Sequence, residues 1–459
     1  MRLPFLLYLA SLFCMNMFGQ VAANRLPIVW QTKILATVAN DIDLTHDSGF
    51  IVVGNLGYYN NGTNTSDGII VKLDTNGDIE WQHTVGGDGT DGLTKVITDS
   101  DDNYYCFGYS SSPASGVPAT GIKEIWVLKF SASGNIIWNK TYYDNYTQAV
   151  NAILTSDGNI AVAAQGVVLK IDTAGNELWK INSNYFHTGN IAETYNHQLV
   201  VSGGYQLDLE TGDTTNLHWN LPVNFNESSI QMINDKIFIL YEQFVSSFCP
   251  SGASGNIANG LGYFNGIDGE FFYNTWHMNL CADGGRYGGA EVHTYSENAL
   301  ALLNDTSFIA AGSFENVYSN KSQAFIYYNK EFNLYGVWEE SYHTEFNSVK
   351  VLPGQKEFVC VGFTNNDYGE LGESNGGFVV KLSAISTCVW TGIKNSDWHD
   401  AENWDTKMIP DAGAIVMIPG GLTNFPVIKN DASCYSLQVA PTASLTVTQG
   451  YQLRIFGRK

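Results

Sequence analysis

The fold is decided by the stretch VKLDTNGDIEWQHTVGG, residues 71–87. An apolar strand is followed by a tight turn of Asp, Asn and Gly, and then by a second strand that carries one tryptophan. Asp74, Asn76 and Asp78 resemble half of a calcium loop, but Ser131 replaces the first acid in the next copy of the phrase, SASGNIIW. The copies share a glycine where a hairpin needs a positive φ. We therefore interpret the stretch as a hairpin turn, and Trp81 as a core residue between neighbouring units.

This phrase is one part of an internal repeat. Its copies end at tryptophans, with an unpaired copy at the N-terminus: Trp30, Trp81, Trp138, Trp179, Trp219, Trp276 and Trp338. Two further phrases, a turn followed by an apolar strand and an apolar strand such as GIIVKLD, recur as often. Each unit therefore consists of four short strands, a to d, and such units bury their faces only by stacking radially. We predict an all-β fold: a seven-bladed β-propeller closed by the N-terminal strand, which completes the last blade.

Composition narrows the class of partner. The 459 residues contain 23 Lys and Arg against 45 Asp and Glu, which gives a net charge of −22. A chain this acidic repels phosphate backbones, so nucleic acid is not an expected partner. Aromatic residues at 13%, charged residues at only 15% and 46 glycines suit short strands and turns.

The N-terminal segment predicts export. It begins with Arg2 and continues with an apolar run over 3–18, followed by small residues at 19 and 22–23. The run is too short to span a bilayer, and no later segment is long and apolar enough to do so. We predict a signal peptide over 1–23 that is cleaved, no membrane span, and a mature protein that is secreted or lies at the cell surface.

Six cysteines follow the predicted signal peptide. An even number in an exported chain favours disulfides, and local spacing suggests Cys249 with Cys281 and Cys388 with Cys434. The remaining two, Cys106 and Cys360, occupy equivalent apolar strand positions in different repeats, and we expect them to be buried free thiols.

A family resemblance arises from residues 81–92, WQHTVGGDGTDG, together with DSDDNYYCFGYSSS and IWVLKFSASGNIIW, which follow. This run resembles blades of large propellers exported by type IX secretion and is similar to the wider quinoprotein-dehydrogenase-like propeller superfamily. The resemblance implies the fold and export, because most such proteins have no assigned chemistry. It implies no catalytic residues.

A second resemblance covers the C-terminal residues. The W-T-G pattern at Trp390, with Trp398, Asn403, Trp404 and Pro410, resembles β-rich modules of surface proteins of the same secretion route. We therefore predict a propeller over 24–386 and a small β-rich module over 387–459. The immunoglobulin-like sorting domain that usually follows in that family is not expected, since the chain ends at LRIFGRK.

The long connections between strands b and c, and between strand d and the next strand a, are expected on one face of the ring. Tyrosines among Asn, Ser and Gly populate these loops, and such surfaces suit sugars or protein epitopes. The alternative is that Tyr, common in this chain, simply fills loops. The predicted binding residues are Tyr58, Tyr59, Tyr109, Tyr142, Tyr143, Tyr146, Tyr185, Tyr263 and Tyr368.

Motifs for catalysis are missing from the sequence. It contains no H-E-x-x-H, C-x-x-C or phosphate loop. Asp88 and Asp91 in GGDGTDG offer a weak calcium site, but tight-turn chemistry explains them as well. We predict no cofactor, with calcium as a possible ligand.

These observations favour a non-catalytic binding or adhesion protein, a monomer that recognises a glycan or a surface protein on the long-loop face. Two alternatives stay open. Loop carboxylates on the same face could make the protein a glycan-active enzyme, or the chain could be a structural spacer or a remnant of a larger surface protein.

Overall fold

The computed structural model describes residues 28–455 except for 61–62, 113–122, 143–149, 185, 187–188, 202–204, 219–224, 234–235, 246–255, 266–270, 275–289, 294–299, 303–307, 317–320, 329–330, 336–342, 355–356, 366–375, 384–385 and 412. Within these residues nearly all regular structure is β-strand, with one short 3-10 helix, η2 (Ala401–Asn403). No helix in the described part of the chain is long and apolar enough to cross a membrane. The chain divides into two compact units, one made of Thr32–Lys350 and Cys360–Val379 and the other containing Val380–Lys459.

Five antiparallel four-stranded sheets follow one another along the chain. The first two consist of β2 (Val38–Leu44), β3 (Phe50–Asn60), β4 (Thr63–Leu73), β5 (Ile79–Val85), and of β6 (Asp91–Thr98), β7 (Tyr104–Ser110), β8 (Glu124–Phe130), β9 (Ile136–Tyr142). The third and fourth consist of β10 (Asn151–Leu154), β11 (Ile160–Ala164), β12 (Val167–Ile171), β13 (Glu177–Asn182), and of β14 (Ile191–Glu193), β15 (Gln198–Val201), β16 (Tyr205–Asp208), β17 (Thr214–His218). The fifth consists of β18 (Phe225–Ile233), β19 (Lys236–Val245), β20 (Asn256–Asn265) and β21 (Phe271–Asn274).

A nine-stranded sheet follows. Its strands are β22 (Ala290–His293), β23 (Leu300–Leu302), β24 (Phe308–Asn316), β25 (Lys321–Tyr328), β26 (Glu331–Tyr335), β27 (His343–Val351), β28 (Glu357–Asn365), β29 (Gly376–Ser383) and β1 (Ile28–Lys33). The N-terminal strand β1 lies beside β29. The backbone continues this contact, since the Ile34 N–H donates to the Gly377 carbonyl at 3.1 Å. The predicted closure of the last blade by the N-terminal strand is therefore confirmed.

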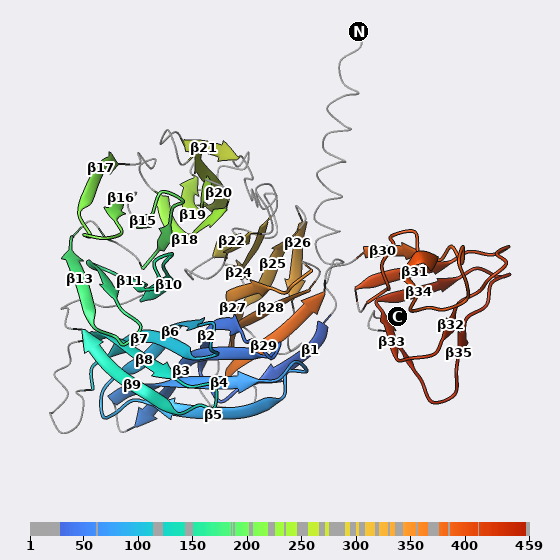
Figure 1. Ribbon diagram of the computed structural model, residues 1–459, viewed down its shortest axis with the longest axis horizontal. Coiled ribbons are helices and arrows are strands. Elements are labelled where there is room, and N and C mark those ends of the chain that lie inside the picture. The colour runs from blue at the N-terminus through green and yellow to red at the C-terminus, as the bar shows by residue number, and fades with distance from the viewer. Residues whose placement is uncertain are drawn as a thin grey trace, which may run out of the picture. The chain divides into compact units, whose positions relative to one another are not determined.

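The sheets are arranged radially (Figure 1). The first strands of successive sheets contact one another: β2 with β6, β6 with β10, β10 with β14, β14 with β18, and β18 with β23. These strands therefore surround a common axis, and each four-stranded sheet is a blade. The predicted all-β propeller is confirmed. The number seven stays a prediction, because β22 to β29 and β1 are joined in one sheet, with a single parallel bridge between Ser322 and His343.

The tryptophan of the repeat packs between blades, as predicted. Trp81 is half-buried against a cluster of the following blade that includes Tyr104 and Phe130. A Cβ on Gly134, in the turn of that following blade, would lie 3.1 Å from the Trp81 ring. Gly134 has φ 80°, so this position combines a left-handed backbone with a close approach of an aromatic ring, and both favour glycine. The same contact recurs between Trp138 and Gly175.

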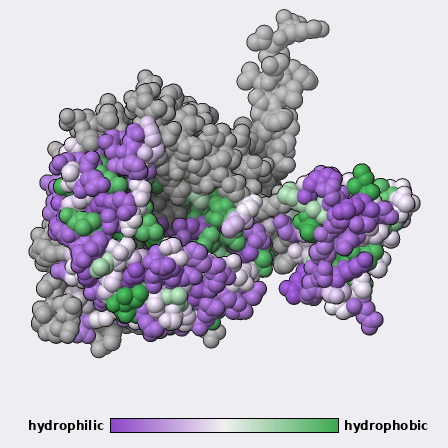
Figure 2. Space-filling model, in the orientation of Figure 1, coloured by the Kyte–Doolittle hydropathy of each residue, from purple (hydrophilic) through white to green (hydrophobic). Residues whose placement is uncertain are grey.

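The outermost strands leave some apolar residues exposed. Ile79, Ile136 and Leu178 are each at least 42% exposed. Ile137, next to Ile136, is 52% exposed as well. The described surface in Figure 2 is largely hydrophilic, and some exposed apolar residues are ordinary on protein surfaces.

A β-bulge near the start of β2, the first strand of the first blade, positions a side chain that contacts the next blade. The register of β2 against β3 shifts between Ala39 and Asp41, which leaves Asn40 as the extra residue. The Asn40 side chain then donates to the carbonyl of Leu93, in the first strand of the next blade, at 2.7 Å. β6 has the same bulge between Leu93 and Lys95, and the Thr94 hydroxyl donates to the Val150 carbonyl at 2.5 Å.

The C-terminal module is built differently, from parallel pairs. Its strands are β30 (Ser386–Val389), β31 (Ala414–Ile418), β32 (Val427–Ile428), β33 (Ala432–Cys434), β34 (Ser436–Val439), β35 (Thr446–Val447) and β36 (Leu453–Ile455). Three tryptophans, Trp390, Trp398 and Trp404, are at most 1% exposed and stack edge to face, so they form the core and not a sugar platform.

The predicted disulfide between Cys388 and Cys434 is absent and is corrected here. Both residues are buried free cysteines within the same apolar cluster as the tryptophans. Cys388 instead accepts a weak hydrogen bond from the Thr406 hydroxyl at 3.7 Å. Cys106 and Cys360 are buried free thiols, as predicted, and burial raises the pKa of each thiol well above its ordinary value. Cys249 and Cys281 lie outside the described residues.

The bulge predicts a sharp difference between two glycines of β3. A Cβ on Gly54 would lie 2.1 Å from the Val38 carbonyl oxygen, whereas a Cβ on Gly57 finds its nearest atom at 3.5 Å. We expect Gly54→Ala to lower the free energy of unfolding by about 1–3 kcal/mol, because the strands must separate. Gly57→Ala should leave it within about 0.5 kcal/mol. Denaturant unfolding of both variants checks this, and equal effects would contradict the packing described.

Candidate functional site

Charged side chains gather where the first strands of three blades meet. Asp41 of β2 is fully buried, and its carboxylate accepts hydrogen bonds from the Val96 N–H at 3.1 Å and the Ser348 hydroxyl at 2.7 Å. The Lys95 ammonium group lies 3.2 Å from the same carboxylate. Residues from β6 and β27 thus converge on one carboxylate of β2. This cluster ties the end of the ring to its beginning.

A second carboxylate lies two residues further along β2. Asp43 accepts a hydrogen bond from the Thr98 N–H at 2.9 Å and pairs with Lys350 at 3.2 Å. Burial raises the pKa of Asp43, but the Lys350 charge and the Thr98 N–H outweigh it, and the pKa lies below its usual value. Burial lowers the pKa of Lys95, while Asp43 raises the pKa of Lys350. Two cations thus match two carboxylates, and this axial cluster serves closure rather than ligand capture.

Asp91 holds together residues 86–91 and 110–112, which form the described corner of the face where the long loops are expected (the long-loop face). This residue is fully buried, and its carboxylate accepts hydrogen bonds from five donors. The donors are the Gly87 N–H, the Ser110 hydroxyl, the Ser111 N–H, the Ser112 N–H and the Ser112 hydroxyl, at 2.6–3.3 Å. The carboxylate therefore fastens the start of one long loop to the d-a loop beside it.

Asp67 of β4 lies beside Asp91. A Cβ on Gly86 would lie 2.1 Å from an Asp67 carboxylate oxygen and 2.9 Å from an Asp91 oxygen, so the two carboxylates flank this glycine. Burial, and secondarily the Asp91 charge, raise the pKa of Asp67. A pair of carboxylates with one raised pKa is a feature of acid–base sites. Here both carboxylate oxygens of Asp91 accept hydrogen bonds from protein donors, and the residue is buried. The pair therefore offers only one accessible carboxyl group, that of Asp67.

Tyr109 of β7 is half-buried at this corner. The Lys123 ammonium group lies over its ring, 4.1 Å from the centroid. A Cβ on Gly92 would lie 2.8 Å from the Tyr109 hydroxyl end, so the ring is held tightly. Burial raises the pKa of the tyrosine and lowers that of Lys123. Tyr109 is therefore held in place by its neighbours, and Lys123 directly follows residues 113–122 in the sequence.

The other predicted tyrosines fall into three groups. Tyr142 is 8% exposed and its hydroxyl donates to the Gly175 carbonyl at 2.7 Å, so it packs between blades and its prediction as a binding residue is corrected. The strands that contain Tyr58, Tyr59 and Tyr263 are described, but their side chains are not. Tyr143, Tyr146, Tyr185 and Tyr368 lie outside the described residues.

The two candidate calcium ligands differ in environment. Asp88 is exposed, whereas Asp91 is buried and satisfied by protein donors. In the part of the chain that the structure describes, no group of three or more His, Cys, Asp and Glu side chains is placed to hold a metal ion. The hydrogen bonds of Asp91 give the motif GGDGTDG a structural role, which is to hold the two neighbouring segments together.

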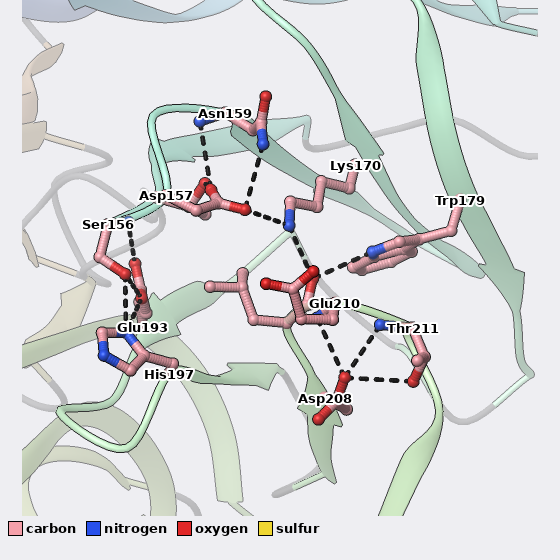
Figure 3. A network of polar contacts seen from close by, with 12 residues as sticks. Ser156, Asp157, Asn159, Lys170, Trp179, Glu193, His197, Asp208, Glu210 and Thr211 are labelled. Atoms are coloured by element: carbon pink, nitrogen blue, oxygen red, sulfur yellow. Dashed lines mark hydrogen bonds and ion pairs between the residues drawn. The ribbon is translucent and has the colours of Figure 1, made fainter.

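A lysine in the third strand of a blade recurs beside the turns of the opposite face. Its role was not predicted from the sequence. Lys170 of β12 is buried and pairs with Asp157 in the a-b turn of its own blade at 2.5 Å, and it donates to the Leu209 carbonyl at 2.8 Å (Figure 3). The lysine at the same place in GIIVKLD, Lys72, pairs with Asp47 at 2.8 Å. The lysine recurs at the same position of the third repeat phrase, and this recurrence could have indicated its role from the sequence.

A serine, a histidine and a glutamate also meet on this face (Figure 3). The Ser156 hydroxyl contacts Nδ1 of His197 at 2.7 Å, and the Glu193 carboxylate contacts the same nitrogen at 3.2 Å. In an acyl-transfer triad the serine and the acid use opposite nitrogens of the ring. Here both use Nδ1, and Ser156 donates its hydroxyl proton to Glu193. The trio is therefore a link between two neighbouring turns and not a nucleophile site.

Replacing Asp91 tests the loop fastener. We expect Asp91→Asn to lower the free energy of unfolding by about 2–4 kcal/mol, because an amide cannot accept from all of these buried donors. The exposed neighbour provides a matched control, and Asp88→Asn should change stability by less than about 0.5 kcal/mol. Thermal unfolding with and without calcium measures both. Calcium-dependent stability lost in both variants would instead support a metal site.

Asp102 controls the titration of His46 on the turn face. The two side chains lie 2.9 Å apart, and the hydrogen bond and charge of Asp102 raise the pKa of His46. We expect Asp102→Asn to bring the pKa of His46 back toward about 6.5. An NMR titration of the histidine ring protons checks this, and an unchanged pKa in the variant would contradict the assigned pair. Because the folded-state pKa is raised, the contribution of this pair is present at low pH and is lost as pH rises through the raised pKa.

Comparison with known proteins gives one family match, over the C-terminal module, and a set of similar solved structures. Residues 389–457 match a family described as a domain of unknown function (DUF8693). No curated protein matches the chain. Among solved structures, the chain is similar to the WD40 domain of Neurospora crassa Pan2, at 13% identity and TM-score 0.44, over 76% of this chain and 90% of that one. It is also similar to the β-propeller domain of the Trilobed protease from Pyrococcus furiosus, at 11% identity and TM-score 0.43, over 76% of this chain and 96% of that one.

Proposed function

We propose that the protein is an exported, non-catalytic binding propeller that recognises a glycan or a surface protein on its long-loop face. The propeller supplies a rigid scaffold on which loops present side chains. The observation that carries the proposal is the Asp91 fastener, which holds two loops of this face with five hydrogen bonds. Fixed loops lower the entropic cost of binding.

Lys123, Asp67 and the exposed Asp88 are charged groups at this corner. Lys123 lies over Tyr109, and Asp67 lies beside Gly86. A corner with a cation, two carboxylates and serine hydroxyls suits a hydroxyl-rich ligand such as a polysaccharide, which both accepts and donates hydrogen bonds. Tyr58 and Tyr59 of β3, together with Tyr143, would add apolar contact area.

Binding is favoured over catalysis for a specific reason. Hydrolysis of a glycosidic bond requires two accessible carboxyl groups facing the substrate. The one close carboxylate pair described on this face includes Asp91, which is closed to solvent. Export, for its part, is proposed from the N-terminal segment alone, and N-terminal sequencing of the mature protein tests it.

The test is a glycan array with a polysaccharide pull-down, performed with and without calcium. We expect retention on a defined glycan that is lost when Tyr58, Tyr59 and Tyr143 become Ala. Tyr195, which is 46% exposed on the turn face, provides the matched control, and Tyr195→Ala should bind normally.

Two outcomes would contradict this proposal. Shortening of the polysaccharide during incubation, abolished by Asp67→Asn, would identify an enzyme that acts through the raised-pKa carboxyl. Equal loss of retention in the Tyr195→Ala control would show that binding does not use the long-loop face.

A further inference from the structure

The C-terminal module consists of two stacked coils of a parallel β-solenoid. β31, β32 and β33 form the first coil, and β34, β35 and β36 form the second. Each strand of the second coil pairs in parallel with its counterpart in the first: Ile415 with Ser436, Val427 with Thr446, and Ala432 with Leu453. The chain therefore repeats one three-sided turn on top of another, and β30 pairs with the far side of the first coil.

The second coil is uncovered on its outer side. Ile418, Ile428 and Cys434 of the first coil are at most 1% exposed. Their register partners in the second coil, Val439, Val447 and Ile455, are 41%, 41% and 52% exposed. Within the described residues, β34, β35 and β36 each have a strand neighbour on one side only. Hydrophobic residues are visible on the surface of this module (Figure 2).

This edge also lacks the residues that normally keep strand edges apart. Open edges are usually protected by charges or proline within the strand. From Tyr435 to Ile455 the sequence contains no acidic residue and a single charge, at Arg454, in a chain with net charge −22. Two copies of the protein therefore repel one another over most of their surface but not at this edge.

We propose that the second coil docks edge to edge with the second coil of another copy of this chain. The open edges of β34, β35 and β36 lie on three sides of one coil. Only a partner with three strands in the same arrangement can pair with all three edges at once. A single extended peptide satisfies one side only, whereas a second copy related by a two-fold axis satisfies all three and covers the exposed Val439, Val447 and Ile455. The protein is then a dimer through its C-terminal module, in place of the monomer expected from the sequence.

Light scattering coupled to gel filtration of the whole protein tests this proposal over a range of concentrations. We expect the wild-type mass to double, reversibly, as concentration rises. Val439→Lys with Ile455→Lys, and separately Gln438→Lys at an already exposed edge position, should hold the mass at that of one chain. Ile393→Lys is the matched control, since Ile393 is 76% exposed in the same module but lies outside the second coil.

The outcomes separate clearly. Far-UV circular dichroism establishes that each variant is folded, and Gln438→Lys serves if the double substitution is not. A wild-type protein that keeps the mass of one chain at every concentration would overturn the proposal. So would a two-chain mass that persists in both folded edge variants. Glycan retention is measured separately, so failure here leaves the proposed binding function intact.

Discussion

Three junctions between blades depend on one kind of contact, in which a side chain of a first strand donates a hydrogen bond to a backbone carbonyl near the start of the next blade. Asn40 reaches Leu93, Thr94 reaches Val150, and Asn347 reaches Ala39 across the point where the chain closes. The bulge frees a side chain to leave its own sheet, and the glycine opposite allows the two strands to approach. At these three junctions the contact fixes the spacing between neighbouring blades close to the axis. The charged cluster around Asp41 then strengthens the junction between the last blade and the first two.

The sequence was sufficient to predict this fold because its signals are local and repeated. The turn glycine and the tryptophan lie within one phrase, so their recurrence reveals blades even though the Trp81–Gly134 contact joins different ones. The axial contacts could not be predicted in the same way. Their side chains differ between copies (Asn, Thr, Asn), and the Asn347–Ala39 bond joins residues 308 positions apart. Only the folded ring brings these groups together.

The candidate site was predicted less completely for a related reason. Loop length identified the face, but it could not distinguish a tyrosine that points outward from one at a strand end that packs inward, as Tyr142 does against Gly175. Asp91 was noted as a metal ligand, and its partners proved to be serines from the neighbouring strand. The cysteine spacing likewise suggested a bond between Cys388 and Cys434, whereas an apolar core with three tryptophans holds the module together without it.

A double-mutant cycle between Asp41 and Ser348 tests most directly whether the ring is closed at its axis. The two side chains share a hydrogen bond of 2.7 Å although 307 residues separate them in the sequence. The unfolding free energies of Asp41→Ala, Ser348→Ala and the double variant give the coupling between them. The closed ring predicts a coupling energy of about 0.5–3 kcal/mol, because both changes remove one shared interaction. Effects that simply add would contradict axial closure and leave the first and last blades unconnected there.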